Sequence, residues 1–385
     1  MPIVSVITPP VVLIFMWAIL GVSLLRYSIL KTHVNRNLYI MLLIIILLIN
    51  IIPFSADINL FGMRVYEHIN IAILPSLTIL YIINYRDIKL CRSLCFCLYI
   101  SLLITTITTI YGNMLFPNAS RMMATGMADN PALLNQYYRY NIGGFDFIYS
   151  IALLIPIMIY VIKNYRKYRY QLFLLLFTSL YSILISEYTT ALLISLIGLS
   201  CFFMSSTITK KCLKSYFVVV VIIIALFYTI IPTILNYIAD MVGSEEIAIR
   251  LHDISDTIMG NEVDDNSDIS SRQNLYMDSI TGFIENPIWG IQTIRGGHSF
   301  TLGVICYWGI FGGLMFFYML NNISKLFLKP FMKTSIYGHM CIFYALYIIV
   351  LTLNPRTYFI VPMFCVPIVA FYFSYKNLVS NSIRI

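Results

Sequence analysis

The sequence predicts an all-α, polytopic integral membrane protein. Of its 385 residues, 59% are hydrophobic and only 11% are charged, whereas soluble domains carry about 25% charged residues. A single hydrophobic core stops growing at about 250–300 residues, so the surplus apolar side chains must face lipid. The mean hydropathy of +0.84 points the same way and excludes a water-soluble globular protein.

Apolar runs long enough, or nearly long enough, to cross the hydrocarbon layer predict about 11 transmembrane helices, within a range of 10–12. No basic residue precedes Arg26, so we expect the first run to be a retained span and not a cleaved signal. The runs fall at about 3–25, 38–54, 69–83, 94–111, 146–162, 171–186, 188–205, 216–237, 298–320, 338–353 and 357–375.

The runs divide the chain into three parts. Residues 1–237 hold the first eight spans and an outer loop at about 112–145. Residues 238–297 form a large outer loop in which we expect two short helices, and residues 298–385 hold the last three spans and a short tail. A loop as long as 238–297 is usually functional.

The charges predict the orientation of these spans. Every lysine falls between spans on one side, which the positive-inside rule makes the cytoplasmic side. All acidic residues except Asp87 fall on the other side. The N-terminus is therefore expected outside and the C-terminus inside. The net charge of +8 lies in short clusters between apolar runs, which favours the lipid surface as the partner and argues against nucleic acid.

The basic residues on the outer side are all arginines. A guanidinium offers a planar fork that matches phosphate oxygens and keeps its charge, so an outer site for a lipid diphosphate would favour it. Chance remains an alternative explanation for so small a set. The outer arginines are Arg64, Arg121, Arg139, Arg250, Arg272, Arg295 and Arg356.

The cysteines lie in spans or at their inner ends, so no disulfide framework is expected outside. No His, Cys or carboxylate spacing indicates a metal site, and we expect no metal and no cofactor. Glu187, in a tight outer hairpin, is the ionisable residue nearest to the middle of a span. It is a candidate base, although a simple polar hairpin residue explains it equally well.

The loop at 112–145 surrounds Arg139 with tyrosines, Tyr137, Tyr138 and Tyr140. Tyr and Arg together suit sugar stacking and phosphate contact. An interfacial loop with aromatic anchors is the alternative interpretation.

Two helices are predicted in the loop at 238–297. The first, between Ser244 and Gly260, places Leu251 on an amphipathic apolar stripe. The second runs from Ser271 to Glu285 and ends before Asn286-Pro287, with an expected apolar stripe of Tyr276, Ile280 and Phe283. Arg272 would lie in its first turn, where a cation opposes the helix dipole, so an anionic ligand is a candidate partner.

The chain returns to the membrane through Arg295, Gly296, Gly297 and His298. Paired glycines let the backbone approach a ligand closely. A histidine at a helix N-terminus can act as a base or as a hydrogen-bond donor. An interfacial histidine can also serve only as an anchor.

Several of these residues resemble the signature of the O-antigen polymerase and ligase superfamily. The order of parts is also similar, because that superfamily has many spans, a large late periplasmic loop with an Arg-bearing helix, and a His at the loop's return. Its usual twelve spans with both ends inside differ from the topology predicted here. The resembling residues are Arg272, Tyr276, Asn286, Pro287, Gly290, His298, Ser299, Phe300, Tyr307, Gly309, Ile310, Gly312 and Gly313.

The resemblance implies an O-antigen polymerase of the Wzy type in the bacterial inner membrane. Such an enzyme transfers a growing glycan from undecaprenyl diphosphate to a lipid-linked repeat unit, and a copolymerase can regulate its chain length. Arg272 would stabilise the departing diphosphate, and His298 or Glu187 would serve as the catalytic base. Further substrate-binding candidates are Arg121, Arg139, Arg250, Arg295, Arg356 and Tyr276.

Two alternatives stay open. An O-antigen ligase would pass the same glycan to the lipid A core. A non-enzymatic flippase or transporter would need a polar path through the spans and usually repeated halves, and the sequence displays neither.

Overall fold

A computed structural model provides the fold, and its regular structure in the part described is entirely helical. It falls into two compact units, of which the first takes in 1–207, 316–349 and 357–385 and the second 208–315 and 350–356. The residues described are 79, 82, 87–117, 119–125, 131–186, 188–202, 232–241, 248–249, 251–252, 255–256, 268–291, 293, 295–332, 334–354 and 361–382.

Three helical segments of the described chain are long and apolar enough to cross a membrane: Ile88–Leu115, Phe145–Asn164 and Arg166–Ile185. The broken pair Phe300–Leu314 and Phe316–Asn322 would make a fourth if it forms one span. Within the described residues, an all-helical structure with helices long and apolar enough to cross a membrane is thereby confirmed. The predicted runs 3–25 and 38–54, and most of 69–83 and 216–237, lie outside the described residues, and the total of about 11 spans stays a prediction.

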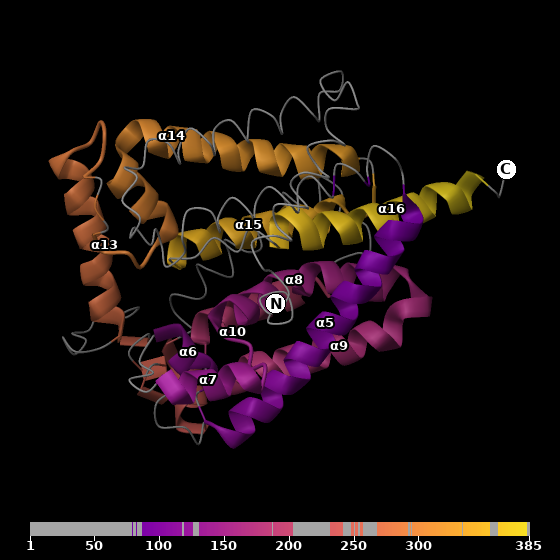
Figure 1. Ribbon diagram of the computed structural model, residues 1–385, viewed down its shortest axis with the longest axis horizontal. Helices are drawn as coiled ribbons and strands as arrows, with labels where there is room; N and C mark the ends of the chain where they lie inside the picture. Colours follow the sequence, from indigo (N-terminus) through magenta and orange to yellow (C-terminus); the bar gives the residue numbers. More distant parts are fainter. Residues whose placement is uncertain are drawn as a thin grey trace. The chain divides into compact units, whose positions relative to one another are not determined.

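The first unit is built around α8 (Phe145–Asn164), which packs against α9 (Arg169–Ile185) and α10 (Thr189–Ser200). Most of α8 is buried because its side chains are apolar all round. The helix α5 (Ile88–Leu115) lies along α9, and α16 (Val366–Ser382) packs against α5 (Figure 1). Asp87 caps α5 by accepting a hydrogen bond from the backbone N–H of Leu90 at 3.0 Å.

Several boundaries differ from the expected ones. The helix α5 is longer than the run 94–111, because Asp87 starts it early and no proline interrupts it before Leu115. By contrast α10 has only 12 residues, about 18 Å at 1.5 Å per residue, which is too short to cross the hydrocarbon layer. The helix α15 (Tyr337–Leu353) matches the predicted run 338–353.

The loop predicted at 112–145 contains two helices, α6 (Ala119–Thr125) and α7 (Pro131–Arg139). Its residues 119–125 and 131–144 are referred to here as the loop platform. Pro131 suits the first helical position, and Asn141 accepts the left-handed backbone, with φ 52°, that ends α7. The buried side chains of Ala119, Tyr137 and Ile142 form a small core within the platform.

A buried polar network joins the loop platform to α5. The Asn113 side chain accepts from the Ser120 N–H at 3.1 Å and donates to the Ser120 hydroxyl at 2.8 Å, which in turn donates to the carbonyl of Gly143 at 2.9 Å. The Gly143 N–H donates to the Thr109 hydroxyl at 2.7 Å. The Tyr188 hydroxyl donates to the Ser120 carbonyl at 2.7 Å. Because these buried groups are paired, the platform is held rigidly.

In the second unit, the predicted amphipathic helix between 244 and 260 is partly described, and its residues 248–249, 251–252 and 255–256 are helical. Leu251 packs against Leu235 and Ala239 of the helical segment 232–241, as its place on the apolar stripe predicts. The His252 ring lies 2.9 Å from the side-chain oxygen of Asn236. The apolar stripe predicted for this helix comprises Leu251 together with Ile247, Ile254 and Ile258, and the last three lie outside the described residues.

The second predicted helix is confirmed as α13 (Asp268–Glu285), which ends at the predicted residue but begins earlier. Two details of the prediction were wrong. Arg272 lies in the second turn, because the helix begins at Asp268, so the first-turn clash with the dipole does not arise. The expected apolar stripe is not the buried face: Ile280 is 38% exposed, whereas Ser279 is buried, because small side chains admit the following segment closely.

After α13 the chain packs against the start of α14 (Phe300–Leu328), which is broken at Gly309. The N–H of Ile291 donates to the Cys306 carbonyl at 3.0 Å, and the N–H of Ile310 donates to the Pro287 carbonyl at 2.8 Å. We call residues 286–291 and 306–310 the glycine seam. Gly290 and Gly309 both have positive φ, and a Cβ on either residue would overlap the backbone of the other segment of the seam.

Candidate functional site

The glycine seam brings together residues that lie far apart along the chain and that carry the family resemblance. Asn286, Pro287 and Gly290 follow α13, whereas Gly309 and Ile310 lie inside the next apolar segment. Broken helices bring unpaired backbone groups to polar sites within a membrane protein. Here two of the backbone groups around the break, the Cys306 carbonyl and the Ile310 N–H, are bonded to the 286–291 turn. These bonds hold the break in place, so it is a fixed structural feature.

In the same unit as the seam, Tyr276 of α13 lies beside His298. Their ring centroids are 6.3 Å apart, at an interplanar angle of 47°. The Tyr276 hydroxyl donates to the carbonyl of Leu353, the last residue of α15, at 3.3 Å. Both rings are half-buried. Three segments distant in sequence therefore meet at these two side chains.

His298 stands immediately before the helix α14. Ser299 is the N-cap, since its hydroxyl accepts from the N–H of Leu302 at 3.2 Å. The positive end of the helix dipole therefore lies next to the imidazole, which suits an anionic ligand nearby. The predicted position of His298 at the start of a helix is confirmed.

Arg295 is exposed and forms a bidentate ion pair with Glu285, in which both carboxylate oxygens lie 2.8 Å from Nη1. The hydrogen bond from Arg295 to Glu285 and the charge of that carboxylate raise the pKa of Arg295. The backbone carbonyl of Arg295 accepts from the Ser279 hydroxyl at 3.2 Å. Arg295 therefore tethers the return segment to α13, a structural role that sequence analysis missed because the pair spans ten residues outside a regular helix.

Arg272 lies on α13, one turn before Tyr276. It shares the second unit with His298 and Arg295, whereas Arg121 and Arg139 belong to the first unit. Arg121 is half-buried on α6. The candidates Glu187, Arg250 and Arg356 lie outside the described residues.

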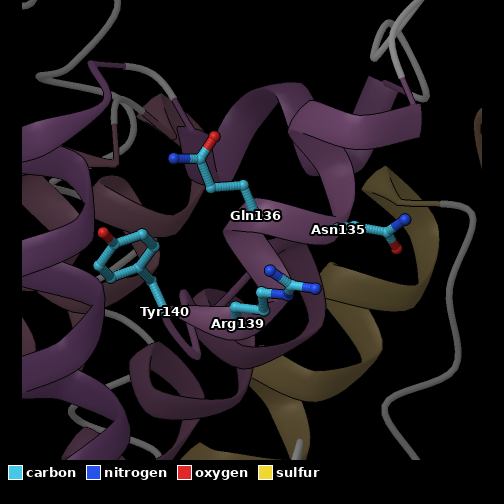
Figure 2. A pocket seen from close by; sticks show the side chains of 4 residues that line it. All are labelled: Asn135, Gln136, Arg139 and Tyr140. Carbon is cyan, nitrogen blue, oxygen red and sulfur yellow. The ribbon is translucent and has the colours of Figure 1, made fainter.

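A pocket of about 530 Å³ in the first unit is lined by Asn135, Gln136, Arg139 and Tyr140 (Figure 2). All four side chains are exposed, and within the described residues Arg139 has no ion-pair partner. The Tyr140 ring packs 5.5 Å from the ring of Phe116, which fixes one wall. Amide, guanidinium and phenol groups offer hydrogen bonds and a stacking face, the features of a saccharide or anion site.

The chemistry that the described residues can perform is binding and proton transfer at an imidazole. No group of three or more His, Cys, Asp or Glu residues that could hold a metal ion occurs among them. Their described cysteines are all free thiols. Comparison of the chain with protein-family models, with curated proteins and with solved structures gives no match.

Proposed function

We propose that this chain is a glycosyltransferase of the O-antigen polymerase type, located in the bacterial inner membrane. It would join undecaprenyl-diphosphate-linked repeat units on the periplasmic face, with about 11 spans, a periplasmic N-terminus and a cytoplasmic C-terminus. The observation that carries the proposal is the pairing of Tyr276 with His298 at the start of α14, in the same unit as the glycine seam, which contains several of the resembling residues.

The proposed reaction forms one bond and breaks one. The acceptor hydroxyl oxygen attacks the anomeric carbon of the donor sugar, and the bond from that carbon to the diphosphate oxygen breaks. The diphosphate leaves with the electron pair, and the hydroxyl proton passes to the imidazole of His298. No nucleotide is needed, because the donor carries its own leaving group.

Positive charge would stabilise the departing diphosphate. Arg272 is our first choice, since it lies one helical turn from Tyr276. Arg295 is a weaker candidate, because Glu285 already neutralises its charge. Arg250 and Arg356 remain candidates from the sequence, as does Glu187 for a second base.

The α7 pocket supports a second contact with substrate. Its exposed amides, tyrosine and guanidinium suit a saccharide of the glycan. The rigid loop platform would hold these side chains without an ordering cost on binding. We propose Arg139 as a binding residue there and not as a catalytic one.

The test is lipopolysaccharide gel banding in a strain that lacks this gene. Complementation with the wild type should restore a ladder, whereas well-expressed His298→Ala or Arg272→Ala should leave a core that carries one repeat unit. Arg166→Ala is the matched control, because Arg166 is exposed on the predicted inner side, and it should restore the full ladder.

Other outcomes would contradict the proposal. Bare core with accumulating lipid-linked polymer in the deletion strain would identify a ligase. An unchanged ladder in that strain would exclude both the polymerase and the ligase, and it would favour the hypothesis of a transporter. If co-expression of a candidate copolymerase narrows the distribution of glycan chain lengths, that result would indicate a copolymerase partner.

A further inference from the structure

The C-terminal end of α15 is fixed by donors from two other helices. The Thr301 hydroxyl donates to the Leu351 carbonyl at 3.2 Å, and the N–H of Phe300 donates to the Asn354 carbonyl at 2.8 Å. Tyr276 bonds the Leu353 carbonyl between them. The last carbonyls of a helix have no partner within it, and here neighbouring helices supply three of those partners.

This arrangement fixes the backbone of Asn354. Its carbonyl contacts the first residue of α14, and its own N–H donates to the Val350 carbonyl at 2.9 Å. His298 lies two residues before Phe300, so Asn354 stands at the same end of α14 as the Tyr276–His298 pair. The whole group belongs to the second unit.

The side chain of Asn354 is 5% exposed, and its amide nitrogen has no hydrogen-bond partner within the described chain. A buried polar group left unpaired destabilises the folded state, because it has lost its hydrogen bonds to water. Leucine has a similar size and would fill the same space without that cost. An amide at this position therefore calls for a specific explanation, and a ligand oxygen supplies one.

We propose that the amide of Asn354 donates a hydrogen bond to a phosphoryl oxygen of the lipid-linked donor. This inference deepens the proposed function and rests on it. The unpaired atom is a donor, so it selects an acceptor, and the adjacent start of α14 carries partial positive charge that favours a phosphate. Asn354 is a binding residue, which holds the diphosphate while His298 acts on the acceptor.

The experiment measures binding of undecaprenyl diphosphate to the purified full-length protein in detergent, together with thermal unfolding of the lipid-free protein. Asn354→Leu should weaken lipid binding about ten- to a hundredfold, as expected for a lost hydrogen bond to a charged group. Its Tm should equal or exceed that of the wild type, because an unpaired buried amide is removed. Asn354→Asp, which replaces the donor with negative charge, should weaken binding further.

Asn322→Leu is the matched control. Asn322 is also buried with an unpaired amide nitrogen, but it lies in the first unit. It should bind the lipid like the wild type. Equal weakening in both variants would mean that loss of any buried amide disturbs the protein, and it would overturn the inference.

Two further outcomes separate the inference from the proposed function. If Asn354→Leu binds the lipid normally, or loses binding only as its Tm falls, the amide has a structural role or holds a water, and the inference is wrong while the polymerase proposal stands. If deletion of the gene leaves the ladder unchanged but Asn354→Leu still weakens binding, the polymerase proposal fails and the binding residue stands. A wild type that binds no lipid contradicts both.

Discussion

The loop platform of the first unit and the glycine seam of the second unit both hold chain segments against membrane helices, but by different bonds. The platform is joined to α5 by side chains, chiefly those of Asn113, Ser120 and Thr109. The two segments of the seam are joined to each other by backbone groups that come into reach only because Gly290 and Gly309 lack a Cβ. A side-chain network can lose one member and keep the rest, whereas a backbone seam depends on each glycine.

The largest effect should follow Gly290→Ala. Its Cβ would overlap the Tyr307 carbonyl, and its φ of 73° disfavours any side chain. We expect the free energy of unfolding to fall by about 3 kcal/mol or more, visible as a lowered Tm and poor recovery from detergent. Gly313→Ala is the control, because a Cβ added there would lie 3.3 Å from the Cγ1 atom of Ile305 and would meet no backbone atom closer than 4.0 Å. Equal stability of the two variants would contradict the seam.

A smaller effect should follow Asn113→Leu, a change in α5 where that helix is bonded to the loop platform. This change leaves the buried N–H of Ser120 without its acceptor, which costs roughly 2 kcal/mol. The Tm should fall less than in Gly290→Ala, because Thr109 and Tyr188 still hold the platform. Ser150→Ala, which removes only a hydroxyl bonded within its own helix, should leave the Tm unchanged. A fall in Tm as large as that of Gly290→Ala would show that the platform depends on a single residue as strongly as the seam does.

Tyr276→Phe removes the hydroxyl that donates to Leu353 but keeps the ring beside His298. The stability cost should be about 1 kcal/mol, as for one neutral hydrogen bond. If the ring positions His298, polymer length on the gel should be retained in part, whereas Tyr276→Ala should abolish it. Identical gels for the two variants would indicate that the hydroxyl, and not the ring, matters.

The smallest effect on stability should come from Arg295→Ala. The pair with Glu285 is exposed, so salt screens it and its net contribution is slight. Because Glu285 raises the pKa of Arg295, the arginine stays charged as the pH rises from neutral to alkaline values, and no stability is lost in that range from its titration. Thermal unfolding at low and high salt, at pH 7 and pH 9, checks this. A loss at pH 9 in the wild type alone would contradict it.

Local sequence features predicted much of the described fold. The end of α13 follows from Asn286-Pro287, because the residue before a proline avoids helical geometry. Long apolar runs predicted α5, α8, α9 and α15 within a few residues. The helices α6 and α7 were not predicted, because both are short, at 7 and 9 residues, and their placement depends on a side-chain network with α5.

Local patterns in the sequence predicted helices long and apolar enough to cross a membrane, and the described residues contain such helices, because hydropathy and capping act over a few neighbouring residues. The sequence also singled out His298 and Tyr276 as candidates. The packing of the folded chain was needed to learn that these two rings meet, that Glu285 neutralises Arg295, and that the end of α15 lies at the start of α14, where it holds Asn354. Those contacts join residues ten or more positions apart, and they depend on how closely backbones approach, which no local pattern encodes.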